Sequence, residues 1–196
     1  MSIPRFDGGG TLPAFVGSDP TGRGTRSPYR ASIDDLIDRF ATSRDRAKLL
    51  IGLNQYRKRL FDGGFIAGRQ WIDGSFVEDV ESTRNRPPKD IDVVTLFNRP
   101  LKYFSDPKLW AHDYRAFLHN DFFNTLTIKP KYHCDTYCID MDGDPFSSVS
   151  SATYWFGLFS EQRGSSRRKG IVEVPLATDP MEFQRVDSQL AVKFNV

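Results

Sequence analysis

The first clear pattern along the chain is a set of apolar residues that recur every three or four positions, beginning just after Ser32. This spacing puts the apolar side chains on one face and predicts an amphipathic helix. Ser32 and Asp35 match a capping box at its start. Residues 42–43 (Thr-Ser) indicate a break, and residues 62–64 (Asp-Gly-Gly) end the pattern. The apolar positions are Ile33, Leu36, Ile37, Phe40, Ala47, Leu50, Ile51 and Leu60.

Four shorter segments have the composition of β-strands. We expect a short strand from Gln70 to Asp73, a central strand from Asp90 to Phe97, and a third strand from Lys131 to Asp140. A last strand is predicted from Ile171 to Leu176.

Helical segments are expected between these strands. A brief helix is predicted from Phe76 to Glu81, and the segment 84–88 is a loop because its two prolines cannot continue a helix. Residues 106–107 (Asp-Pro) are typical of the start of another helix. A short helix is expected from Ser151 to Phe159. This order predicts an α/β or α+β fold, with a small mixed β-sheet flanked by helices.

Residues 1–31 differ from the rest of the chain because they are rich in Gly, Pro, Ser and Arg. Such a composition cannot sustain a helix or a central strand. The segment is either a disordered leader or an extended arm, for which the apolar residues between Leu12 and Val16 would be the anchors. We therefore divide the chain into an N-terminal arm over residues 1–31 and a folded domain over residues 32–196.

Composition narrows the class of protein only slightly. A chain of 196 residues fits one domain, and a net charge of +2 is too small for a protein that coats nucleic acid. Cys134 and Cys138 would lie about 13 Å apart on one strand, beyond the limit of about 7 Å for a disulfide. The N-terminus has no signal-peptide pattern, and no apolar run is long enough to span a membrane. We expect a soluble, cytoplasmic protein with reduced thiols.

The candidate chemistry begins with Asp90 and Asp92. Residues two apart on a strand point to the same face, so both carboxylates face one way while Ile91 and Val93 face the core. At about 4 Å and an effective dielectric constant of about 20, two such charges repel by roughly 4 kcal/mol. A shared proton would offset this repulsion, and so would a hard cation. Mg²⁺ prefers a few carboxylate oxygens together with phosphate oxygens and water.

Gly74 and Ser75 follow the first predicted strand and precede a helical segment. Backbone N–H groups are free at such a junction, and together with the Ser75 hydroxyl they would hold a phosphate. Gly74 allows a close approach of the chain. A phosphate site beside a metal site is what the chemistry of nucleoside triphosphates requires.

These two motifs together resemble a known signature. Gly74-Ser75, followed by Asp90-Ile91-Asp92, resembles the signature of the DNA polymerase beta-like nucleotidyltransferase superfamily, although the spacer here is longer than usual. The string from Trp71 to Phe97 is similar to a bacterial family of small nucleotidyltransferase-like proteins of largely unassigned function. The similarity extends to the Gly-x-Leu-Pro at residues 10–13 and to the Lys-Gly-Ile-Val at residues 169–172.

The resemblance implies a polymerase beta-like palm fold for residues 32–196 and a third carboxylate on a later strand. Asp135, Asp140 and Asp142 are the candidates. Asp135 and Asp140 would face opposite sides of a regular strand, so only one of them can join Asp90 and Asp92. We choose Asp135, since a turn explains the other two. His133 would share its strand face.

The residues themselves and the resemblance together indicate the roles of the remaining site residues. The cofactor would be Mg²⁺ or Mn²⁺, held by Asp90, Asp92 and Asp135, which are also the predicted catalytic residues. A solvated loop or face is an open alternative for the basic residues, Lys89 included. The predicted nucleotide-binding residues are Gly74, Ser75, Lys89, Arg163 and Lys169.

The expected activity is transfer of a nucleoside monophosphate from a nucleoside triphosphate to a hydroxyl group, with release of pyrophosphate. The acceptor would be a protein, a nucleic acid or a nucleotide, and a partner protein would help to select it. The resemblance places such proteins in bacterial toxin–antitoxin or anti-phage systems. The alternative is a catalytically silent protein that binds a nucleotide as a sensor or neutralises a partner. A third class, a nuclease or phosphatase using the same carboxylates, is disfavoured by the position of Gly74-Ser75.

Overall fold

The computed structural model describes residues 3–165 and 167–195. Met1 and Ser2 of the predicted arm, and Val196 at the end of the predicted domain, lie outside the described residues. The strands are β1 (Tyr29–Arg30), β2 (Gly68–Asp73), β3 (Ile91–Phe97), β4 (Cys134–Asp140) and β5 (Val172–Pro175). The α-helices are α1 (Ile33–Phe40), α2 (Arg44–Asp62), α3 (Val80–Arg84), α4 (Pro107–Asp113), α5 (Thr125–Tyr132), α6 (Pro145–Phe159) and α7 (Met181–Phe194). Shorter helical turns are η1 (Arg23–Thr25), η2 (Gly74–Val77) and η3 (Leu101–Tyr103), and a π-helical stretch, η4, covers Tyr114–Phe123.

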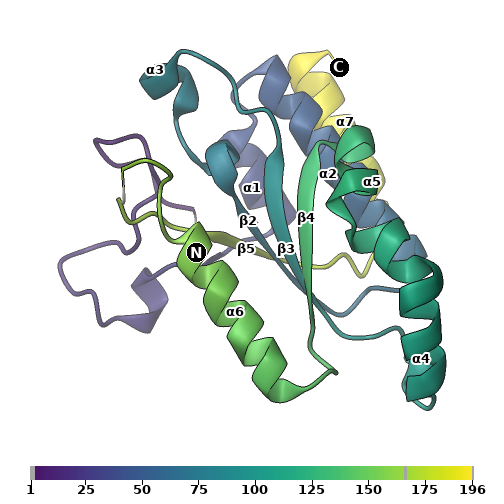
Figure 1. Cartoon of the computed structure of the whole chain (residues 1–196). Coiled ribbons are helices and arrows are strands. Elements are labelled where there is room, and N and C mark those ends of the chain that lie inside the picture. Colours follow the sequence, from purple (N-terminus) through teal and green to yellow (C-terminus); the bar gives the residue numbers. More distant parts are fainter. Residues whose placement is uncertain (1–2, 166, 196) are drawn as a thin grey trace.

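The strands form one five-stranded mixed sheet in the order β1-β5-β2-β3-β4. Strand β2 runs antiparallel to both β3 and β5, whereas β3 and β4 are parallel, as are β1 and β5. Helix α6 lies on one side of the sheet, and α1, α2 and α7 lie on the other (Figure 1). The expectation of a small mixed sheet flanked by helices is therefore confirmed, and the fold is α+β.

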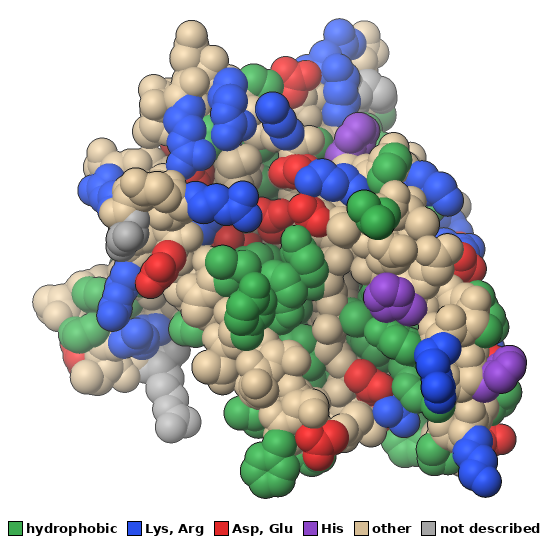
Figure 2. Space-filling model, viewed as in Figure 1, with side chains coloured by type: hydrophobic (Ala, Val, Ile, Leu, Met, Phe, Trp, Pro, Cys, Tyr) green, Lys and Arg blue, Asp and Glu red, His purple; other side chains and the backbone are tan. Residues whose placement is uncertain are grey.

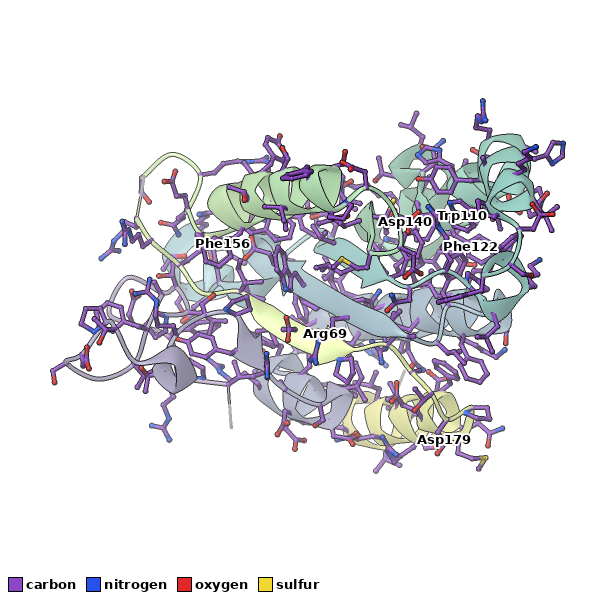
Figure 3. All side chains as sticks on the ribbon, turned by 90° about the horizontal axis from the view of Figure 1, so that it is seen from below. Arg69, Trp110, Phe122, Asp140, Phe156 and Asp179 are labelled. Carbon is purple, nitrogen blue, oxygen red and sulfur yellow. The ribbon has the colours of Figure 1, made fainter. Side chains whose placement is uncertain are left out.

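Each face of the sheet has its own apolar core. The larger core lies between the sheet and α1, α2, α5 and α7, and it contains Ile91 and Val93 of β3. The smaller core lies under α6 and contains Val94. Figure 3 shows the two layers from below, with Phe156 of α6 labelled near the sheet. Because side chains alternate along a strand, Asp92 lies on the same face as Val94 and α6.

Several local signals in the sequence correspond to the observed elements. The Ser32–Asp35 capping box is present at the start of α1. The predicted break separates α1 from α2, and Ser43 caps the second helix. Asp106 caps α4 with Pro107 at its first position. Cys134 and Cys138 are free thiols, as expected.

The strand predicted from residue 131 was wrong at its start. Residues 125–132 form α5, with Pro130 inside the helix, and β4 begins only at Cys134. His133 follows the helix as its C-cap, with a φ of 54°, and its side chain is exposed. It precedes β4 and therefore does not share a strand face with Asp135. The local helical pattern of this segment is weak, and contacts of α5 with α2 and β4 stabilise the helix instead.

Two helix predictions were also imprecise. The brief helix expected at residues 76–81 is instead the turn η2 followed by α3, with the Asp79 side chain capping α3. The helix expected from Ser151 begins earlier, at Pro145, because the Asp144 side chain caps it.

The N-terminal segment is in contact with the domain. Leu12 is fully buried, and its carbonyl accepts a hydrogen bond from the backbone N–H of Gly170. Thr11 forms an antiparallel bridge with Glu78. Phe15 and Val16 are more exposed than Leu12, at 36% and 45%. The described helices include none with the length and apolar character that a bilayer span requires.

Candidate active site

Three carboxylates lie side by side across the sheet. Asp73 ends β2 and is the register partner of Asp92 in β3, and Asp92 is in turn the register partner of Asp135 in β4. Asp90 directly precedes β3. This row lies on the face that α6 covers farther along the strands, because Asp73 shares its face with Trp71 of the smaller core.

Lys129 of α5 reaches two of the acids at once. Its Nζ atom lies 2.6 Å from Oδ2 of Asp90 and 3.0 Å from Oδ2 of Asp135. The hydrogen bond to Asp90, reinforced by Asp135, raises the pKa of Lys129 above its ordinary value despite partial burial. Burial alone would raise the pKa of Asp135, but hydrogen bonds from Thr125 and Lys129 lower it overall. The Lys129 ammonium group therefore lies between the carboxylates of Asp90 and Asp135 and forms an ion pair with each.

Of these acids, Asp92 has the negative charge that the surrounding protein stabilises least. Among the described residues, no side chain or backbone amide donates a hydrogen bond to its carboxylate. Burial, followed by the negative charges of Asp90 and Asp135, raises the pKa of Asp92 to about 6. Its charged form is therefore poorly stabilised by the protein and would be favoured by a bound cation.

Asp73 has a different environment, because it is buried beside Lys169. Their side chains are each 4% exposed, and Lys169 Nζ lies 3.0 Å from Oδ2 of Asp73 and 3.1 Å from Oε1 of Glu78. Burial raises the pKa of Asp73 to about 7, against the lowering effect of Lys169. One buried cation thus serves two carboxylates, and Oδ1 of Asp73 has no hydrogen-bond partner.

Gly74 and Ser75 begin the turn η2 directly after β2, at the predicted strand–helix junction. Gly74 has a φ of 79°, and a Cβ atom added there would lie 2.1 Å from Oδ2 of Asp92. Only glycine fits this backbone against that carboxylate. Arg46 of α2 holds the turn from below, since its guanidinium donates to the carbonyls of Phe76 and Glu78.

All eight site residues predicted from the sequence line one pocket of about 440 Å³. Figure 2 shows its acidic centre, with basic side chains above it and hydrophobic side chains below it. Lys89 and Arg163 are exposed at its rim, whereas Lys169 is buried in its wall. Asp140 and Asp142 lie outside the pocket, where they bind Arg99 at the other end of β4.

Sequence reasoning missed several charged residues that line the same pocket, among them Asp73, Glu78 and Lys129. Asp73 precedes Gly74, and its alternation with Trp71 on β2 was a usable signal. Glu78 shares Lys169 with Asp73. Lys129 gave no local signal, because its position depends on the packing of α5 against β4.

The residues present fit a hard divalent cation in type. Within residues 3–165 and 167–195, no group of three or more His, Cys, Asp and Glu side chains is already arranged to bind a metal. The acids nevertheless offer only oxygen atoms, which Mg²⁺ and Mn²⁺ prefer. Asp92 has no donor among its described neighbours, and Oδ1 of Asp73 is buried without a partner. Both observations indicate carboxylate oxygens that have unused capacity for a cation.

The fold and the pocket define an α+β domain with an acidic site at one edge of its sheet. The chain belongs to the family described as a family of unknown function, DUF6932, whose family model matches residues 4–175. That match runs from the N-terminal segment to the end of β5 and leaves α7 outside. The chain has no significant match among curated proteins or among solved structures.

Proposed function

We propose that this protein is a divalent-metal-dependent nucleotidyltransferase with a polymerase beta-like palm. It would transfer a nucleoside monophosphate from a nucleoside triphosphate to a hydroxyl group. The observation that carries the proposal is the close approach of Gly74 to the carboxylate of Asp92, so close that an added Cβ would lie 2.1 Å from its Oδ2; Asp92 is in turn in register with Asp135. A turn suited to phosphate and a group of acids suited to cations thus adjoin each other in one pocket.

The roles of the residues follow from their chemistry. Mg²⁺ or Mn²⁺, held by Asp90, Asp92 and Asp135, would neutralise the triphosphate and lower the pKa of the attacking hydroxyl. Ser75 and the amides of η2 would bind phosphate oxygens. Lys89 and Arg163 at the rim would bind the outer phosphates, and Lys169 would hold Asp73 and Glu78 in place beneath the turn.

A second candidate function is a silent protein that binds a nucleotide without transferring it. The Lys129 ammonium favours this reading, since it already forms ion pairs with Asp90 and Asp135. A lysine in that position supplies positive charge to a polyphosphate without any metal. Under either function we propose a cytoplasmic protein that acts with a partner, and the resemblance to small bacterial nucleotidyltransferases supports a toxin–antitoxin or anti-phage setting.

The test uses ligand-induced thermal stabilisation followed by pyrophosphate release. ATP should raise the melting temperature only when Mg²⁺ or Mn²⁺ is present, and Asp92→Asn should abolish this effect. Asp62→Asn, on the exposed end of α2, is the matched control and should keep it. Metal-dependent binding without pyrophosphate release, with cell lysate as the source of acceptors, would favour the silent protein. Cleavage of a labelled oligonucleotide without triphosphate would instead favour a nuclease.

A further inference from the structure

The pocket has two chemically different walls. The charged wall comes from the end of β2, from the starts of β3 and β4, and from the loop before β3. The opposite wall is apolar and comes mainly from the end of α6, with Trp155, Leu158 and Phe159, to which β4 adds Tyr137. Figure 2 shows hydrophobic side chains directly below the acidic centre of this face. We call Tyr137, Trp155, Leu158 and Phe159 the aromatic wall.

Trp155 is the centre of this wall, and its neighbours fix its orientation. Its ring centroid lies 4.0 Å from that of Tyr137, with 33° between the ring planes. Tyr154 and Phe159 contact it edge-on, at centroid distances of 5.0 and 5.8 Å. The indole remains partly exposed to the pocket. A flat, rigid and partly exposed ring is suited to stacking with another flat ring.

The aromatic wall adjoins the acids. Tyr137 is two residues after Asp135 on β4, so the two side chains leave the same face of the sheet. Burial, with the charges of Asp135 and Asp92, raises the pKa of Tyr137 to about 12. A ligand whose phosphates meet the charged wall would therefore have its remaining part beside Tyr137 and Trp155.

We propose that the aromatic wall binds the base of the nucleoside triphosphate, by stacking of the base on the Trp155 indole. The inference rests on the nucleotidyltransferase proposal and adds the position and the selectivity of the base. A pocket of about 440 Å³ lies within the size range of small-molecule sites. Stacking accepts every base, because each has a flat face.

The hydrogen bonds of Gln162 determine the expected selectivity. Gln162 follows α6 and lines the pocket, but its Nε2 donates to Glu78 and its Oε1 accepts from Ser165. These two hydrogen bonds hold the amide against Glu78 and Ser165, so we expect it to contribute little to reading the edge of a base. Purines should bind more tightly than pyrimidines because they offer more stacking surface, and ATP and GTP should bind about equally.

The experiment compares ATP with inorganic tripolyphosphate, each with Mn²⁺, by titration calorimetry. Tripolyphosphate probes the charged wall alone, whereas ATP probes both walls. Trp155→Leu keeps an apolar side chain but removes the flat ring. It should weaken ATP binding about 5- to 150-fold, the equivalent of about 1–3 kcal/mol, and leave tripolyphosphate binding unchanged. Trp155→Phe should keep most of the ATP affinity, and Phe146→Ala, at the exposed start of α6, should change neither ligand.

The outcomes separate this inference from the function on which it rests. If the wild-type protein binds tripolyphosphate but binds ATP no more tightly, the base site is wrong and the phosphate site stands. The base site is also wrong if Trp155→Leu weakens both ligands equally, or if it weakens neither. If the wild-type protein binds neither ligand, both proposals are overturned.

Discussion

Asp92 and Asp135 lie directly opposite each other in the parallel register of β3 and β4. The preceding register pair fixes this alignment, because Ile91 and Cys134 are both buried in the larger core. A slip of one residue would turn Asp135 into that core and expose Cys134. The apolar positions of the two strands therefore bring these carboxylates together.

The close carboxylates make the stability of the protein depend on pH. The pKa of Asp92 is raised to about 6 and that of Asp73 to about 7, so the folded state keeps protons that the unfolded state loses above pH 4. The free energy of unfolding should therefore fall as the pH rises from about 4 to about 7. Urea unfolding of the metal-free protein at pH 5 and pH 8 measures this change.

Asp92→Asn isolates the contribution of one acid. The variant removes a carboxyl group whose pKa is raised to about 6, roughly two above its ordinary value. At pH 8, where this carboxyl is charged, the variant should raise the free energy of unfolding by up to about 3 kcal/mol. At pH 4, where the carboxyl is protonated in the folded wild type, the free energy of unfolding should be nearly unchanged. A variant less stable than the wild type at pH 8 would mean that the Asp92 charge is well compensated.

Lys129 should compete with divalent cations for Asp90 and Asp135. Lys129→Met removes the internal cation, so the metal-free variant should melt about 2–4 °C lower, the effect of about 1 kcal/mol in a protein of this size. MgCl₂ should then stabilise the variant more than it stabilises the wild type. Lys131→Met, an exposed change on the same helix, is the control. Equal Mg²⁺ stabilisation of all three proteins would show that Lys129 does not share the cation site.

Lys169 should be essential for stability whether or not the site is catalytic. Lys169→Met leaves Asp73 and Glu78 buried without their shared cation and should cost about 3–5 kcal/mol. Adding Asp73→Asn should recover part of this loss, because Asp73 is then the acid without a cation, whereas Glu78 keeps its ion pair with Arg84. Chemical unfolding of the single and double variants tests both statements. A double variant that is no more stable than Lys169→Met would remove Asp73 from the explanation.

Gly74 should be irreplaceable for a reason that differs from backbone strain. Gly74→Ala and Gly17→Ala both place a side chain at positive φ, which should cost about 1 kcal/mol of stability in each, and the clash with Asp92 should add to this cost in Gly74→Ala. Only at position 74 does the new Cβ meet Asp92, whereas position 17 has open space. Gly74→Ala should therefore abolish the metal-dependent stabilisation by ATP, and Gly17→Ala should keep it. Similar ATP responses of the two variants would argue against contact between the turn and the acids.

The parts of the fold that local patterns determine were predictable from the sequence. Helix caps such as Ser32 and Asp106 act within a few residues, and the alternation of Asp92 with Val93 follows from strand geometry. Helix α7 was missed although Phe183, Val186 and Leu190 have helical spacing. That signal was present in the sequence.

Other features depend on contacts between distant segments. Strand β1 is two residues long and exists only through its pairing with β5, from the far end of the chain. Lys129 reaches Asp90 only because α5 packs against β4, and Trp155 reaches the pocket only because α6 crosses the sheet. No spacing within the sequence encodes these positions, so the acids could be predicted but not the lysine or the aromatic wall.

The most direct test of the central claim follows the α-phosphate of a nucleoside triphosphate. The protein is incubated with Mn²⁺, cell lysate and ATP labelled either at the α- or at the γ-phosphate. The account predicts that the protein adds α-label to an acceptor above the level seen in lysate alone, that it adds no γ-label above that level, and that Asp92→Asn removes the added α-label. Protein-dependent transfer of the γ-label, or transfer of the α-label that is equally strong with Asp92→Asn, would contradict it.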